Sequence, residues 1–292
     1  MVKPNPAAHP TPSPLEPGLY VTATPIGNSR DITLRALDIL RDCDAIVAED
    51  TRTTSKLLAI HGISRPLLAY NDHNAPRMRP AILGRLERGE RLALVSDAGT
   101  PLISDPGYKL VRAALEAGAK VHVIPGVSAA IAALVLSALP TDRFLFAGFL
   151  PPMNAARRTA LSELKAVTGS LIFFEAPQRL AECLRDMSDI FGERPAAVAR
   201  ELTKLHEDVR RGDLRALADH FSETGAPRGE ITIVVGPPLT AEPDMDRADA
   251  LLDRALEFMP ARTAAEFVSD ALSLPRRLVY NRAISRKESR ES

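Results

Sequence analysis

Apolar and polar positions alternate along the first half of the chain in a way that predicts strands and helices in turn. Short apolar runs rich in Val, Ile and Leu predict strands at 19–23, 45–48, 67–70, 92–95 and 121–124. Between them, apolar residues recur at helical spacing, which predicts helices at 32–40, 54–61, 79–88 and 107–117. Strands separated by helices usually pair in parallel, so this half predicts a mostly parallel α/β sheet.

After Pro125 and Gly126 the spacing changes and indicates a second α/β unit with more antiparallel pairing. Helices are expected at 127–139, 157–167 and 180–191, and strands at 144–149, 171–174, 196–199 and 230–235. Beyond this unit, helical patterns occur at 248–258, 263–271 and 276–287. The fold class expected is therefore α/β, with two α/β domains and a small C-terminal helical module.

Proline and charge mark the expected domain boundaries. Prolines crowd the first 17 residues without an apolar segment, which is typical of a flexible tail and not of a secretion signal. The domains expected are a tail at 1–17, α/β domains at 18–124 and 125–240, and a C-terminal part at 241–292. Within the last, 241–249 is acidic and is interpreted as a linker, whereas arginines dominate from 262 onward. Such a basic module either holds phosphate backbones or is a solvated helical cap, and charge alone leaves both open.

Composition narrows the class of protein. The chain has 292 residues, with 37 Lys and Arg against 37 Asp and Glu, so no overall field draws it onto nucleic acid. Cys43 and Cys183 are far apart and belong to no CxxC or Cys/His cluster, which argues against a disulfide scaffold or a zinc site and fits the reducing cytoplasm. The longest apolar run, 127–139, is too short to span a bilayer, so no membrane partner is expected.

Polar loops follow each of the five expected strands of the first half, at 24–28, 49–52, 71–74, 96–107 and 125–129. Ligands of open α/β sheets bind beyond the carboxyl ends of the strands, so these loops predict a ligand cleft. Neither GxGxxG nor GxxxxGK[ST] is present, which excludes the usual phosphate cradles of dinucleotide and NTP enzymes.

Several residues of these loops are candidates for chemistry. Gly99 allows close approach of a ligand to the backbone, and Asp97 and Asp105 suit a cation, a hydroxyl or an amine better than a polyphosphate. Alternatively, the two aspartates cap turns and the helix that follows. Glu49 and Asp50 could act as bases beside Arg52, or the same string could cap a helix.

In the second half, charged residues at the strand ends either bracket a substrate or form an interdomain salt-bridge network. These residues are Glu175, Glu201 and Lys204.

The loops, taken in order, resemble the tetrapyrrole-methylase superfamily of S-adenosylmethionine (SAM) enzymes, and most of all its branch that methylates ribose in 16S ribosomal RNA. The resemblance rests on ATPIGN at 23–28, DITLRAL at 31–37, AEDTR at 48–52, SDAGTPLISDPGY at 96–108, PGVSA at 125–129, GFLP at 148–151 and RELTK at 200–204. It extends from Gly18 to about Gly236, and 262–287 resembles that branch's C-terminal helical domain. The chain departs from the family pattern at 176–179, where APQR replaces Ser-Pro-His-Arg, and in the loop at 71–74.

The resemblance implies two α/β domains with SAM in the cleft between them, and a homodimer. It implies that Pro25, Asp97, Ala98, Gly99, Ser128 and Ala129 line the cofactor, with Phe174, Leu202 and Ile231 from the second domain. The activity implied is 2′-O-ribose methylation of a cytidine in the decoding region of 16S ribosomal RNA, within the small ribosomal subunit. Glu49, Asp50 and Arg52 are the first candidates for the catalytic or RNA-binding face, ahead of Glu175, Glu201 and Lys204.

Two other functions stay open from the sequence. One is C-methylation of a tetrapyrrole precursor, which would need an arginine-rich cleft and no basic appendage. The other is a noncatalytic RNA-binding assembly factor built on a methylase fold. The chain has no Trp, and candidates for stacking on bases are few, mainly Tyr70, Phe146, Phe149 and Phe173, which favours recognition of an assembled particle by shape.

Overall fold

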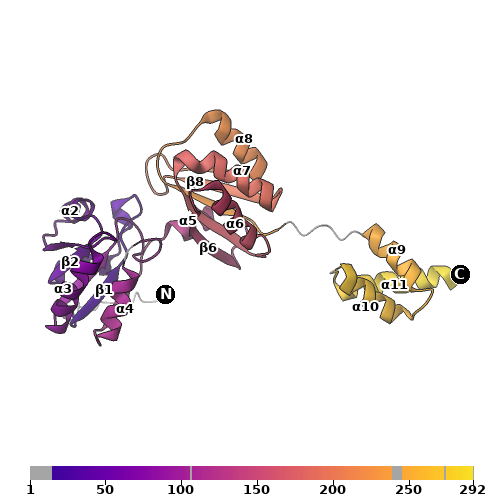
Figure 1. Cartoon of the computed structure of the whole chain (residues 1–292), viewed down its shortest axis with the longest axis horizontal. Coiled ribbons are helices and arrows are strands. Elements are labelled where there is room, and N and C mark those ends of the chain that lie inside the picture. The colour runs from indigo at the N-terminus through magenta and orange to yellow at the C-terminus, as the bar shows by residue number, and fades with distance from the viewer. Residues whose placement is uncertain (1–14, 106, 239–244, 273, 292) are drawn as a thin grey trace, which may run out of the picture. The chain divides into compact units, whose positions relative to one another are not determined.

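The computed structural model describes residues 15–105, 107–238, 245–272 and 274–291. The chain divides after Pro238 into two compact units (Figure 1). The first unit contains two five-stranded sheets, and the second contains helices with a core of their own.

The first sheet is parallel throughout, as the sequence predicts. Its strand order is β3-β2-β4-β1-β5. The strands are β1 (Gly18–Thr22), β2 (Ala45–Ala48), β3 (Leu67–Ala69), β4 (Arg91–Val95) and β5 (Val121–Ile124). The helices are α1 (Leu34–Asp42), α2 (Thr51–Ile60), α3 (Ala75–Glu87) and α4 (Tyr108–Glu116), with a 3-10 turn η1 (Ser29–Asp31). Both faces of the sheet are buried, because Ile46 of β2 belongs to the core beneath α1 and α2 and Val47 to the core beneath α3 and α4.

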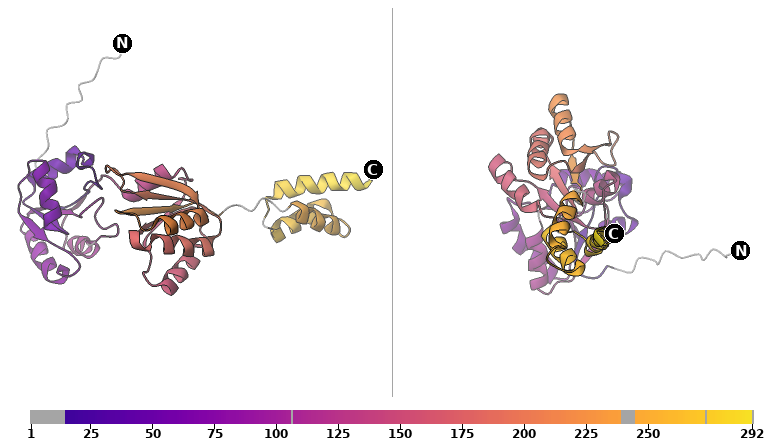
Figure 2. Two further views of the ribbon diagram at one scale, coloured as in Figure 1. Left: turned by 90° about the horizontal axis from the view of Figure 1, so that it is seen from above. Right: turned by 90° about the vertical axis from the view of Figure 1, so that its right-hand side faces the viewer.

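The second sheet is mainly antiparallel, as the spacing of the second half predicts. Its order is β6-β7-β10-β8-β9, and only β6 and β7 pair in parallel. The strands are β6 (Phe144–Phe149), β7 (Ser170–Glu175), β8 (Pro195–Arg200), β9 (Asp208–Asp213) and β10 (Ile231–Val235). Helix α5 (Ala129–Ser137) packs on one face. The other face carries α6 (Asn154–Leu164), α7 (Leu180–Phe191) and α8 (Leu214–Thr224), which lie together in Figure 2, and the 3-10 turn η2 (Pro177–Arg179) precedes α7.

A buried ion-pair network holds α6 to α7. The Arg157 side chain is fully buried, and its guanidinium lies 2.7 Å from an Asp186 oxygen and 2.9 Å from an oxygen of Glu182. Arg158 and Asn154 also donate to Asp186. Burial opposes ionisation of Asp186, but hydrogen bonds from Arg158 and Arg157 lower its pKa below the usual value.

We expect Arg157→Met to lower the free energy of unfolding by about 3–5 kcal/mol, because it leaves the buried Asp186 carboxylate with part of its partners removed. Urea denaturation followed by circular dichroism measures this loss. Arg112→Met is the matched control, since Arg112 and Glu116 form an exposed pair whose loss costs well under about 1 kcal/mol. Equal losses in the two variants would contradict a structural role for the network.

The second unit consists of α9 (Met245–Ala255), α10 (Ala261–Leu272) and α11 (Arg276–Glu291) around a small apolar core. The expected acidic linker at 241–249 is wrong in its second half, because α9 already begins at Met245. Asp249 is buried there and accepts hydrogen bonds from Arg282, with an Nη2–Oδ2 distance of 2.7 Å. This aspartate therefore anchors α11 to α9 and is no part of a linker; residues 239–244 lie outside the described part of the chain.

The expectation of a flexible tail at 1–17 is wrong for its last residues. Residues 1–14 lie outside the described residues, but Leu15 packs on the core beneath α1. Glu16 pairs with Lys120 at 2.6 Å, and its carbonyl accepts a hydrogen bond from the Tyr20 hydroxyl. The last residues before Gly18 therefore belong to the first domain.

Candidate active site

The loops after β1 and β4 are joined at the carboxyl edge of the first sheet. Thr24 and Gly99 form a two-way backbone bridge, with N–O distances of 2.8 and 3.0 Å, and the Thr24 hydroxyl donates to the Ser96 carbonyl. Gly99 has φ of +74°, and a Cβ there would lie 3.3 Å from Ile26 Cγ2. The turn thus needs glycine for its conformation and for its close approach to the first loop.

The loop after β5 joins the same edge. The Thr100 hydroxyl lies 3.4 Å from the Val127 carbonyl oxygen, and a Cβ on Gly126 would lie 2.7 Å from Ala23 Cβ. Ser128 follows as the N-terminal cap position of α5. The three loops that carry Pro25, Asp97 to Gly99, and Ser128 with Ala129 therefore form one continuous rim.

Three carboxylates with raised pKa values lie at this edge: Asp97 and Asp105 on the rim, and Glu49 on the loop after β2, where the Asp50 backbone donates to Asp97 at 3.1 Å. Burial is the largest cause for Glu49, Asp97 and Asp105, and mutual repulsion adds to it, since Asp105 and Asp97 raise the pKa of Glu49. Titratable groups with perturbed pKa values concentrate at functional sites, so this edge is the candidate active site. Among the described residues, no cluster of three or more His, Cys, Asp or Glu side chains is arranged to hold a metal ion.

Glu49 and Asp50, although adjacent, have different surroundings. The Asp50 carboxylate caps α2 by accepting from the Arg52 backbone at 2.8 Å, and it also pairs with the Arg52 side chain. Hydrogen bonds from Arg52 lower the pKa of Asp50 to about 2. Asp50 is therefore a weak base and a structural cap, whereas half-buried Glu49 is the better base of the pair.

The Asp97–Gly107 loop has a strained backbone, and Asp105 in this loop is not the N-terminal cap of the next helix, α4. Leu102 and Ser104 have φ values of 74° and 67°, which side chains other than glycine rarely adopt. The capping position of α4 is occupied by Gly107, which has no side chain to cap with. The alternative interpretation of Asp105 as a helix cap is thus wrong, and its carboxylate instead interacts with Ser96.

The loop after β8 contacts the first domain at the rim. The Asn28 backbone donates to the Thr203 hydroxyl at 3.0 Å, and a Cβ on Gly27 would lie 2.5 Å from Lys204 Cγ. Lys204 in turn pairs with Glu201 and Glu230 at 2.8 and 2.9 Å. The ion pairs of Lys204 therefore lie within the second domain, so the expected interdomain salt-bridge network is wrong for Glu201 and Lys204. Close packing and the hydrogen bond to the Thr203 hydroxyl connect the second domain to the first.

An apolar cluster connects residues of both domains beside the rim. It includes Ile26, Ala130 and Leu202, with Ala129 and Phe174 packed against it. Ile231 belongs instead to the core on the opposite face of the second sheet. Of the expected cofactor contacts in the second domain, Phe174 and Leu202 therefore lie on the face of the sheet that α5 covers. The Ile231 side chain lies on the other face, so only its backbone could contact the cofactor. The cofactor roles of all these residues stay predictions.

The structure removes some of the other candidates. Glu175 is buried, and its Oε1 accepts from Arg179 and from the Ala176 backbone, so it lies in the interior and is a poor candidate for the base. Phe173 and Tyr70 are buried core residues, so neither can stack on a base. Phe149 remains largely exposed.

Sequence reasoning missed a small pocket that opens at the carboxyl edge. It has a volume of about 210 Å³ and combines the loops after β3 and β4. Its lining includes Asp72, Asp105, Arg79, Lys109 and Tyr108. Tyr108 is 64% exposed and directly follows Gly107 of the strained loop. It is therefore a further candidate for stacking on a base, which the sequence did not indicate.

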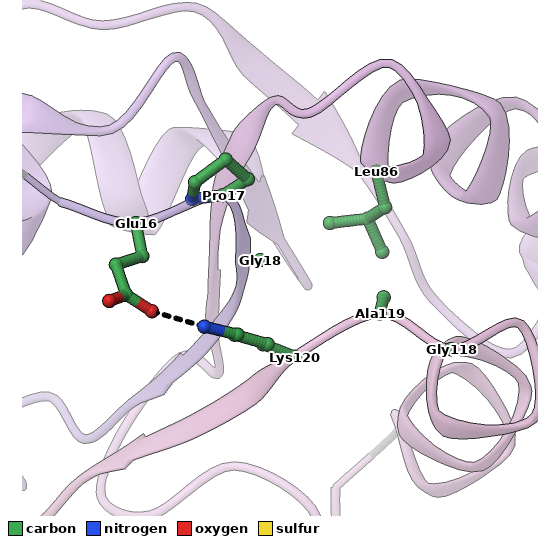
Figure 3. Close-up of a pocket in the computed structure, with 7 residues that line it drawn as sticks. All are labelled: Glu16, Pro17, Gly18, Leu86, Gly118, Ala119 and Lys120. Atoms are coloured by element: carbon green, nitrogen blue, oxygen red, sulfur yellow. Dashed lines mark hydrogen bonds and ion pairs between the residues drawn. The ribbon is translucent and has the colours of Figure 1, made fainter.

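A larger pocket, of about 310 Å³, lies at the other end of the first sheet (Figure 3). It adjoins Gly18 and Lys120, where β1 and β5 begin, and Figure 3 shows the ion pair between Glu16 and Lys120, two of its lining residues. Because ligands of open α/β sheets bind at the carboxyl ends, its larger size does not make it the active site.

Comparison with known proteins gives matches over both units. A profile described as Tetrapyrrole (Corrin/Porphyrin) Methylases matches residues 18–218, and one described as RsmI C-terminal HTH domain matches residues 241–287. The chain is 48% identical over 277 residues to the ribosomal RNA small subunit methyltransferase I of Mesorhizobium japonicum, covering 94% of each chain. It is 52% identical over 274 residues to the protein of that name from Erythrobacter litoralis, covering 94% of this chain and 97% of the relative.

Solved structures show the same fold at low sequence identity. A cobalt precorrin-4 methyltransferase superposes with a TM-score of 0.57 at 18% identity, covering 75% of this chain and 94% of the other. A uroporphyrin-III C-methyltransferase from Thermus thermophilus, solved with S-adenosyl homocysteine, gives 0.54 at 17% identity, covering 74% and 96%. No helix in the described part of the chain is long and apolar enough to cross a membrane.

Proposed function

Because this chain belongs to the tetrapyrrole methylase family, we propose that it is a SAM-dependent methyltransferase of small-subunit ribosomal RNA that acts on a cytidine ribose 2′-oxygen. The family membership and the relatives support the use of SAM and ribosomal RNA as the substrate class. The cytidine, its 2′-oxygen and its position in the decoding region of 16S RNA are the finer part of the proposal. An enzyme that acts on ribosomal subunits works in the cytoplasm, so the proposal includes that location.

The observation that carries the proposal is the rim of joined loops together with the nearby carboxylates, whose pKa values are raised. SAM has a sulfonium, an amino group and a carboxylate but no phosphate, and it suits a site with Asp97 and a close backbone turn at Gly99. Pro25, Ala98, Ser128 and Ala129 lie on the same rim, and Phe174 and Leu202 supply an apolar surface beside it. The residues present therefore fit the cofactor.

When bound, SAM supplies a methyl group on a positively charged sulfur, which is a good leaving group. The protein has to hold the ribose oxygen in line with that methyl group and remove its proton. We assign the role of general base to Glu49: its carboxylate accepts the 2′-hydroxyl proton as the oxygen–methyl bond forms. Its raised pKa brings it closer to neutral pH and so makes it a stronger base than Asp50.

The pocket beside Tyr108 provides contacts for the target nucleotide. Arg79 and Lys109 supply positive charge for flanking phosphates, and the exposed Tyr108 ring offers a stacking surface. The exposed Arg52 guanidinium, held by Asp50, lies at the start of α2 on the same sheet edge and adds a further phosphate contact.

Mass spectrometry of nucleosides from 16S ribosomal RNA, with and without the gene, tests the proposal. We expect one 2′-O-methylcytidine to disappear when the gene is deleted and to return when it is restored. Unchanged ribose methylation, with a C-methylated tetrapyrrole absent instead, would support the tetrapyrrole hypothesis from the sequence. A restored methyl group with an active-site variant would support a noncatalytic assembly factor.

We also infer a homodimer, as the resemblance implies. Large apolar side chains stay exposed near the edge strand β5 and on α5, where Val123, Ile131 and Val135 lie. Leu34 is exposed next to Arg35, which donates to the Val123 carbonyl. Such surfaces are typical of protein interfaces, and sedimentation equilibrium of the full chain tests for the dimer.

Removing the second unit should leave the cofactor site intact. A chain that ends after Thr240 keeps both sheets and their cores, because the helices after 245 have a separate core. We expect SAM affinity by calorimetry to change less than about twofold. Methylation of small-subunit particles should fall at least about tenfold, because the arginines that neutralise RNA phosphates are removed. A truncated chain that cannot bind SAM would show that the second unit is a structural cap.

A further inference from the structure

The pairing of arginines within the second unit separates two kinds of cation on α11. Arg282 and Arg286 pair with Asp249 and Asp253 at 2.6–3.0 Å, so their charge serves to hold α11 to α9. Arg276 and Arg277, at the start of the same helix, instead line a pocket. The basic character of α11 therefore cannot be assigned as a whole to nucleic-acid binding.

This pocket of about 380 Å³ opens between α10 and α11, within the size range of ligand sites. Its lining consists of Arg262, Ala265, Glu266, Arg276, Arg277 and Tyr280. Three arginines and a single glutamate thus line this space.

These guanidinium groups contribute little to holding the helices together. Arg262 and Glu266 are 3.8 Å apart with both side chains exposed, and Arg276 reaches Asp270 at 3.3 Å with both side chains exposed as well. Arg277 has no ion pair among the described residues. Exposed ion pairs of this kind contribute little to stability, and cations in the first turn of a helix oppose its dipole. Stability therefore does not explain why three arginines occur here.

Tyr280 gives the pocket a second kind of contact. It is 43% exposed and lies about one turn of α11 beyond Arg276 and Arg277, so part of its ring is open to a ligand. One arginine guanidinium can donate to two oxygens of the same phosphate, and an aromatic ring can stack on any nucleobase. The combination fits one nucleotide of a flexible strand better than a rigid duplex, whose bases are covered by their neighbours.

We propose that the pocket between α10 and α11 binds single-stranded RNA, with Arg262, Arg276 and Arg277 on the phosphates and Tyr280 stacked on a base. This inference rests on the proposed function, because it gives the second unit the task of holding RNA next to the methylated segment. It locates the RNA contact of this unit on α10 and the start of α11, and excludes Arg282 and Arg286.

Fluorescence anisotropy of the full chain with fluorescein-labelled oligocytidylate, without SAM, tests the pocket directly. For Arg262→Gln with Arg277→Gln we expect weaker binding and a log–log salt slope that is shallower by roughly 0.7 for each phosphate no longer neutralised. For Tyr280→Leu we expect at least about fivefold weaker binding with an unchanged slope, whereas Tyr280→Phe keeps the ring and the affinity. Arg254→Gln, an exposed arginine of α9 outside the pocket, is the control and should bind as the unchanged protein does.

Each contrary outcome is distinct. Equal binding by all variants, or an equal decrease in the Arg254 control, would overturn the pocket as an RNA site. A decrease in particle methylation with unchanged oligocytidylate binding would show that the pocket docks on a ribosomal protein instead. Competition by duplex RNA as strong as that by single strands would overturn stacking by Tyr280. Calorimetry of SAM and methyl transfer to the particle, measured on the same samples, show separately whether the proposed activity itself fails.

Discussion

Glu49→Gln is expected to lower kcat for ribosomal RNA methylation by about 10²–10⁴-fold, the usual contribution of a general base. The glutamine keeps the size of the side chain and cannot accept the 2′-hydroxyl proton. SAM affinity should stay within about twofold, because Glu49 follows β2 and is not part of the joined loops at Thr24, Gly99 and Val127. Single-turnover methylation with radiolabelled SAM measures the chemical step, and calorimetry measures the cofactor.

The pH dependence gives a second readout. The pKa of Glu49 is raised from 4.5 by burial and by Asp105 and Asp97, so the rate should rise with pH as this group ionises above 4.5. The same shift affects stability: between 4.5 and the raised value the folded protein binds more protons than the unfolded chain, so stability falls as pH rises through that window. At pH 7 the variant should therefore melt at a higher temperature than the unchanged protein, and the difference should shrink below about pH 4.5.

Asp50→Asn is the matched control for Glu49→Gln. Asparagine caps helices about as well as aspartate, so α2 should keep its first turn. Because the pKa of Asp50 is held at about 2, it contributes little as a base, and the control should keep most of its kcat. A large rate decrease in Asp50→Asn with a small one in Glu49→Gln would reverse our assignment of the two carboxylates.

The sequence predicted the regular elements best where one face is strongly apolar. Helix α7 was predicted with its observed bounds, because its apolar residues recur at helical spacing over its whole length. By contrast, β9 and α8 were missed: β9 reads as a charged segment, and it is an edge strand that needs little apolar surface. Helix α3 begins at Ala75 although 79 was expected: Pro76 is accommodated in its first turn, and Pro80 lies inside the helix.

The position of the site followed from the topology, but the roles of its residues did not. Five loops after parallel strands had to meet at one edge, and this is where the raised carboxylates occur. The sequence could not show which of Glu49 and Asp50 is the better base, because their pKa values depend on which carboxylate caps α2 and which is partly buried. Nor could it place Ile231 away from Phe174, since the facing of β10 depends on its register with β7.

Gly99→Val is expected to reduce SAM affinity by about 100-fold or more, while the protein stays folded. A β-branched residue at φ of +74° is strained by about 1–2 kcal/mol or more, and its Cβ would press on Ile26 at 3.3 Å. The backbone can relieve both only by leaving the bridge to Thr24, which separates the loops that carry Asp97 and Pro25. Calorimetry with SAM, together with a thermal melt, measures the two effects separately.

Gly118→Val separates damage to the cofactor site from the general cost of a left-handed backbone. Gly118 has φ of +78°, and a Cβ there meets no atom within 4 Å, so this variant carries the same kind of backbone strain without the steric clash. It lines the pocket at the amino end of the first sheet, remote from the carboxyl edge. We expect both variants to melt at lower temperature, and Gly118→Val to bind SAM as tightly as the unchanged protein. If Gly99→Val bound SAM equally well, the turn at Gly99 would be a structural feature only, and the cofactor would have to be held by residues other than this rim.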